Sequence, residues 1–246
     1  MIFVALVAFG VAATIAAAGP GTRLGLWEYG AGISIIRNMA LPSMIAVGLA
    51  ILAFIASLFM ARNLALLMFI ALAAATGAAI VPLKFEQGVA ANPFIHDITT
   101  DFENPPGIAA AADLPRKNPA AYLGDDPAPK SEMTVAEAQR NAFPDIQPII
   151  VDMKVDQAAD ISSAIIGAMK MEILKEGTTE EGAIIEATYT SFWFGFVDDF
   201  IIRIRPREGK TRIDVRSKSR VGVSDLGANA RRVRDFLSRF GEEAAS

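Results

Sequence analysis

Three long apolar runs occupy the first third of the chain, and regular alternation of apolar and polar residues appears only after them. The runs cover residues 2–18, 39–61 and 64–83, and none contains Asp, Glu, Lys, Arg or His. Each is close to the roughly 20 residues that a helix needs to cross a bilayer. Ionisable residues inside a span usually mark an ion pathway, so their absence favours an anchor over a transporter. We predict three transmembrane helices within residues 1–84.

Residues 85–131 are rich in Pro, Gly, Asn, Asp and Ala and show no sustained periodicity, which predicts an extended connector. Within this segment, His96, Asp97 and Asp101 lie close together in the sequence. One histidine and two carboxylates can bind a divalent cation or transfer protons. Asp97, Thr99 and Thr100 also suit turns beside Pro105 and Pro106, and we favour the turn interpretation.

Residues 132–246 change between helical and strand periodicity, which predicts one domain of mixed structure. Thr134 followed by Glu137 is a capping box and predicts a short helix. After it we expect a strand at 149–155, a helix at 157–171, a hairpin of 172–177 with 181–192, a second hairpin of 196–205 with 211–221, and a helix at 224–240 capped by Ser224 or Asp225. The order β-α-β-β-β-β-α predicts an α+β fold, a two-layer sandwich with an antiparallel sheet that is apolar on one side.

The second hairpin separates apolar from charged residues most clearly. Phe200, Ile202 and Ile204 alternate with Asp199, Ile201, Arg203 and Arg205, so one face of the sheet is expected to be apolar and the other charged. The charge pattern predicts that Arg203 lies opposite Asp214 across the hairpin, with Arg205 opposite Arg212 and Asp199 beside Lys218. We expect the charged face, including Arg216, to be exposed to solvent.

Composition excludes several classes of function. Cysteine is absent and histidine occurs once, so disulfides, thiolate sites and metal sites with several imidazoles are excluded. The net charge of −4 provides no general basic field, which argues against a nucleic-acid partner. The P-loop, the dinucleotide fingerprint, the G-x-S-x-G elbow and the H-E-x-x-H motif do not occur. We expect no cofactor and assign no metal site.

The run FWFGFVDDFIIRIRP, followed by IDVRSKSRVGVSDLGANARRVRDF, resembles the bacterial and plastid family known as domain of unknown function family 1499. HDITTD at 96–101 and AFPDIQP at 142–148 also resemble segments of that family, so the resemblance covers roughly residues 92–240. The family has no established activity. The resemblance therefore implies a fold and a compartment, since its plastid members are expected in the thylakoid lumen.

Two functions fit these observations. The first is a membrane-anchored binding or assembly module, which presents the charged sheet face to a membrane or periplasmic protein partner or to an anionic ligand. The alternative is a membrane-tethered enzyme that uses Asp198 and Asp199 with His96 and arginines for acid/base, metal or phosphate chemistry. We prefer binding because no strong catalytic motif is present. The candidate binding residues are Asp198, Asp199, Arg203, Asp214, Arg216, Ser217, Ser219, Arg220, Asp225, Asn229 and His96.

Two observations bear on the membrane orientation, and they point to opposite sides. The loop after the first span carries Arg23 and Arg37, whereas the next loop carries only Arg62. Counted alone, these charges place the first loop and the C-terminal domain in the cytoplasm. The family resemblance favours the opposite side. We predict three helices in the bilayer of a bacterial inner membrane, with the N-terminus inside and residues 85–246 in the periplasm.

Overall fold

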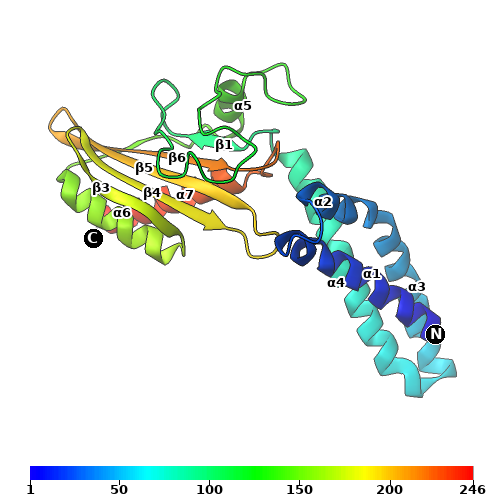
Figure 1. Ribbon diagram of the computed structural model, residues 1–246. Helices are drawn as coiled ribbons and strands as arrows, with labels where there is room; N and C mark the ends of the chain where they lie inside the picture. Colours follow the sequence, from blue (N-terminus) through cyan, green and yellow to red (C-terminus); the bar gives the residue numbers. More distant parts are fainter. Residues whose placement is uncertain (246) are drawn as a thin grey trace. The chain divides into compact units, whose positions relative to one another are not determined.

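The computed structural model describes residues 1–245, which form two compact units (Figure 1). The membrane unit comprises Met1–Ala90 together with the short segment Phe192–Gly195. The sheet unit comprises Ala91–Ser191 and the chain from Phe196 onward. The chain therefore passes between the two units three times.

The membrane unit contains three helices long and apolar enough to span a bilayer, as the three runs predict. They are α1 (Ile2–Arg23), α3 (Ala40–Met60) and α4 (Ala65–Ala91), with the helix α2 (Tyr29–Asn38) and the single turn η1 (Arg62–Leu64) between them. Their contacts consist mainly of small side chains, including Ala8, Ala50 and Ala75, which let helices approach closely. The last helix extends past the predicted end of the anchor, because charged and polar residues from Lys84 onward end the apolar run without ending the helix.

The sheet unit is built on an antiparallel sheet in the order β1-β6-β5-β4-β3, with β2 also pairing with β6. The strands are β1 (Asp97–Thr99), β2 (Ile149–Val151), β3 (Glu172–Thr179), β4 (Gly182–Thr190), β5 (Val197–Arg207) and β6 (Lys210–Ser219). The helices are α5 (Val135–Ala142), α6 (Val155–Ala168) and α7 (Ala228–Ala244). From β2 to α7 the predicted order is confirmed, whereas β1 lies in the segment that we interpreted as turns.

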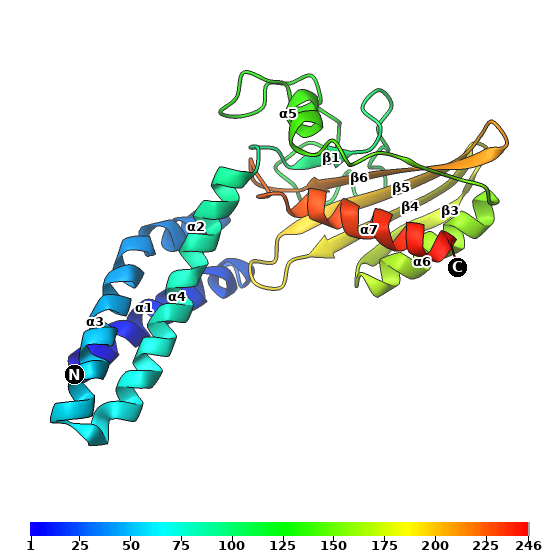
Figure 2. The same ribbon diagram turned by 180° about the vertical axis from the view of Figure 1, so that it is seen from behind.

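The apolar face of the sheet packs against α6 and α7, which lie side by side beneath it (Figures 1 and 2). Phe200, Ile202 and Val215 are fully buried there, and the ring of Phe200 lies 5.6 Å from that of Phe236 on α7. The predicted hairpin register is also confirmed, since Arg203 is the partner of Asp214. Alternation at a period of two was enough to fix both the face and the register.

The opposite, charged face of the sheet is covered, contrary to our expectation of a solvent-exposed surface. Residues 100–131, here called the strap, run over it as irregular chain together with α5 (Figures 1 and 2). Arg216 and Lys218 in the middle of this face are only 2% and 1% exposed. The composition of the strap correctly predicted irregular backbone, but an irregular segment can still pack when its carbonyl groups accept hydrogen bonds from buried cations.

Candidate functional site

The buried charged face is organised around separate carboxylates, and the first is Asp97 on β1. Arg216 binds it with two parallel hydrogen bonds, Nε to Oδ1 at 2.9 Å and Nη2 to Oδ2 at 2.8 Å. Lys218 Nζ lies 2.9 Å from the same Oδ2. Burial lowers the pKa of Lys218, and the Asp97 charge opposes that shift. The two cations also donate to carbonyl groups of the strap, those of Pro106, Ala120 and Ala121.

A second cluster surrounds Asp199 on β5. Arg220 donates from Nε to Oδ1 at 2.9 Å, and Arg116 of the strap places Nη1 3.1 Å from Oδ2. The neighbouring Asp198 lies on the opposite face of the sheet, where Arg232 of α7 binds it at 2.9 Å. Our sequence analysis missed Arg116, because its segment has no periodicity that would assign it to a face of the sheet.

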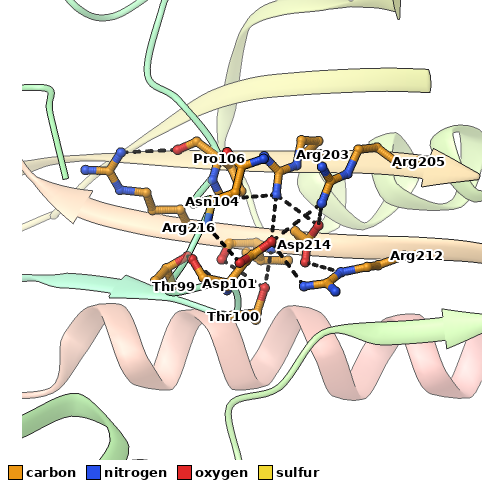
Figure 3. A network of polar contacts seen from close by, with 11 residues as sticks. Thr99, Thr100, Asp101, Asn104, Pro106, Arg203, Arg205, Arg212, Asp214 and Arg216 are labelled. Carbon is orange, nitrogen blue, oxygen red and sulfur yellow. Dashed lines mark hydrogen bonds and ion pairs between the residues drawn. The ribbon is translucent and has the colours of Figure 1, made fainter. Parts of the chain in front are cut away.

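A third cluster joins the two predicted partners of the hairpin (Figure 3). Arg203, Arg205 and Arg212 surround Asp214, with nitrogen–oxygen distances of 3.1, 2.9 and 2.8 Å. Asp101 of the strap contacts the same three guanidinium groups at 3.1 to 3.5 Å. The carboxylates offset the repulsion between Arg205 and Arg212, which lie opposite each other across the hairpin.

Asn229 on α7 links the remaining candidate residues. Its side-chain oxygen accepts hydrogen bonds from Ser217 Oγ and from Arg232 Nη1, both at 2.6 Å. Its Nδ2 donates to Ser219 Oγ at 2.9 Å and to the His96 carbonyl oxygen at 3.1 Å. Asn229 is fully buried and therefore connects α7 to β6 and to the residue that precedes β1.

Two further candidates have altered acidity. Burial is the main cause that lowers the pKa of His96, and Lys218 adds to it while Asp97 opposes it. The predicted cap at Ser224 or Asp225 was wrong, because α7 begins at Ala228 with Gly227 at its N-cap position and no side-chain cap. Asp225 instead accepts hydrogen bonds from the backbone N–H groups of Gly227 and Asn229. Burial nevertheless raises the pKa of Asp225 to about 6.

The raised pKa of Asp225 gives a pH-dependent contribution to stability. An unfolded aspartate has a pKa of about 3.9, so between about pH 4 and 6 the folded protein holds a proton that the unfolded chain has released. The stability contributed by that protonated carboxyl is lost as the pH rises through 6. We expect Asp225→Asn to gain about 2 kcal/mol of stability relative to the wild type as the pH rises from 4.5 to 7, measured from unfolding curves across that range.

Asp145→Asn is the matched control for this pH experiment. The Asp145 carboxylate lies on the surface, where Arg234 lowers its pKa. A lowered pKa places its pH dependence near and below pH 4, so this variant should keep a constant difference from the wild type between pH 5 and 7. The same constant difference for Asp225→Asn would show that burial does not raise the pKa of that carboxyl.

The arrangement as a whole is a set of fixed ion pairs beneath a covering segment. Each aspartate of the three clusters is bound by at least one arginine, and the strap contributes Asp101 and Arg116 to them. Within residues 1–245, no group of three or more His, Asp or Glu side chains is placed to hold a metal ion.

The fold and these clusters define a membrane-anchored α+β protein with a buried ionic face. A family model described as Protein of unknown function (DUF1499) matches residues 97–240, which is more than half of the chain and begins at the first strand. The chain therefore belongs to this family, as the resemblance of its C-terminal half indicated. Comparisons with curated proteins and with solved structures gave no match.

Proposed function

We propose that this protein is a membrane-tethered binding or assembly module for a membrane or periplasmic protein partner. The observation that carries the proposal is the state of its candidate acids. Asp198 is held by Arg232, and Asp199 is held by Arg116 and Arg220, all within the protein. Both carboxylates are occupied by cations of the same chain, so we assign these residues to the structure of the module.

The docking surface that we propose is the free edge of β3, in place of the covered charged face. This strand pairs only with β4, and none of the other strands in residues 1–245 lies along its outer edge. All but one of its residues are exposed, and Ile173 among them is apolar. Unpaired backbone groups on an edge can bind an extended segment of a partner. Glu172 and Lys175 on the same strand disfavour indiscriminate pairing.

Site-specific photo-crosslinking in living cells tests this surface. A photoreactive residue at Ile173 of β3 should give a crosslinked product of discrete mass, because that side chain would lie beside the side chains of a bound partner strand. The matched control is Ser238, an exposed position on α7 at a distance from the edge in sequence and fold. Absence of a product at Ile173, or equal products at both positions, would contradict docking at β3.

A second candidate function, an enzyme, is favoured by one observation. His96, Lys218 and Asp225 all have shifted pKa values. The charge of Asp97 acts on His96 and Lys218, and the charge of Asp198 acts on His96 and Asp225. Shifted acidities of this kind gather at catalytic sites as well as in structural ion-pair networks. If His96→Gln melts at the wild-type temperature but no longer rescues a deletion strain, the enzyme becomes the better interpretation.

We further propose that the N-terminus lies inside a bacterial inner membrane and that the sheet unit lies in the periplasm. An odd number of spans places the N-terminus and the sheet unit on opposite sides. The family resemblance supports the outward side, although the arginine count alone favours the inward one. A reporter active only after export, fused after the last residue, should be active. Activity of a cytoplasm-only reporter at the same position would reverse the orientation.

A further inference from the structure

We propose that the loop between β4 and β5, Phe192–Gly195, is a fourth lipid-contacting element that inserts the Phe192 side chain into the bilayer leaflet next to the end of α1. The partner of this surface is the lipid itself. The inference is independent of the proposed docking at β3, because it depends only on residues of the membrane unit.

The loop belongs to the membrane unit through specific contacts with α1. The indole Nε1 of Trp193 donates a hydrogen bond to the Ala16 carbonyl oxygen at 3.3 Å, and the Arg23 guanidinium donates to the Phe192 carbonyl oxygen. The Trp193 ring lies directly on Gly19, where an added Cβ atom would come within 2.5 Å of its Cδ1 atom. Only glycine permits this approach of the ring to the helix backbone.

These contacts define the level of the loop along α1. The apolar run of this helix ends just before Gly19, and Arg23 is its first charged residue. At about 1.5 Å of rise per residue, Ala16 lies roughly 10 Å along the helix from Arg23. The Trp193 indole therefore lies at the boundary between headgroups and acyl chains. Trp27 lies at the same level, since its Nε1 donates to the Ala18 carbonyl oxygen at 3.2 Å, and tryptophan is enriched at this boundary.

Within the loop, Phe192 is the residue whose side chain we assign to the lipid contact. Its side chain is 87% exposed, whereas the ring of Phe194 packs against that of Trp193 with centroids 5.0 Å apart. Leu24 and Leu26, in the turn that follows α1, are 74% and 70% exposed. Single exposed apolar residues are common on proteins, but a group of three at the end of a spanning helix indicates an apolar environment. The acyl-chain boundary supplies one.

The absence of cysteine from the chain allows a direct test with a single engineered label. The full-length Phe192→Cys variant, carrying an environment-sensitive fluorophore, is placed in phospholipid nanodiscs that contain a spin-labelled lipid. The label lies either near the headgroup or near the chain end. The controls are Leu52→Cys on α3, 67% exposed within a span, and Ile150→Cys on β2, 50% exposed in the sheet unit.

We expect the shallow spin label to quench the fluorophore at position 192 at least threefold more strongly than the fluorophore at position 150. The deep spin label should quench most strongly at position 52. Equal quenching at positions 192 and 150 would overturn the proposal.

A second measurement needs no attached label. The chain has two tryptophans, so Trp193 is the only one in a Trp27→Phe variant. Lipids brominated near the headgroup should quench its fluorescence more than lipids brominated near the chain end. If neither lipid quenches Trp193, the loop does not reach the bilayer and the proposal fails.

Discussion

Replacing Asp97 by alanine is expected to lower the free energy of unfolding of the sheet unit by about 3–5 kcal/mol. The substitution leaves the guanidinium of Arg216 and the ammonium of Lys218 buried without their shared carboxylate. Removing one partner of a buried pair costs more than the pair contributes, because the remaining charge stays desolvated. The measurement is urea unfolding of the full-length protein in nanodiscs. Hydrogen exchange of the β6 peptide monitors the unfolding of the sheet unit.

The matched control for this experiment is Asp145→Ala, which removes a partly exposed pair with Arg234 and should cost no more than about 1 kcal/mol. In addition, the double variant Asp97→Leu with Arg216→Met should be more stable than Asp97→Ala, because one of the two unpaired cations is then also removed. A cost for Asp97→Ala equal to that of the surface control would refute the buried pairing.

Asn229→Ala is expected to cost about 2–4 kcal/mol, measured in the same way. This one amide accepts from Ser217 and Arg232 and donates to Ser219 and to a backbone carbonyl. Leaving a buried polar group without a partner costs about 1–3 kcal/mol. Asn141→Ala, at an exposed position on α5, is the control and should stay within about 0.5 kcal/mol of the wild type. Similar free energies of unfolding for both variants would show that Asn229 does not connect α7 to β6 and to the residue before β1.

The fold was predictable wherever periodicity carries the information. Alternation in the second hairpin gave the buried positions Phe200, Ile202 and Ile204, and the charge pattern gave the pairing of Arg203 with Asp214. Both follow from local geometry, because a one-residue slip would turn every side chain to the other face.

The burial of the charged face could not be predicted in this way. A strand with alternating charges has the same sequence pattern whether water or another part of the chain covers it. For this reason, Arg216 was expected on an exposed surface, and that expectation was wrong. Its bidentate partner Asp97 and its acceptor Pro106 lie more than one hundred residues earlier, in segments without periodicity. Only the tertiary structure brings them together.

The packing of Trp193 on Gly19 also matters for how fragments of this protein behave. A fragment that begins at residue 91 keeps the loop Phe192–Gly195 but loses the helix that covers it. Two aromatic rings that now contact α1 or each other would then face water next to an already exposed phenylalanine. Truncation at the apparent domain boundary thus exposes an apolar patch that promotes aggregation. To stay soluble and monomeric, the excised sheet unit requires a short polar turn in place of this loop.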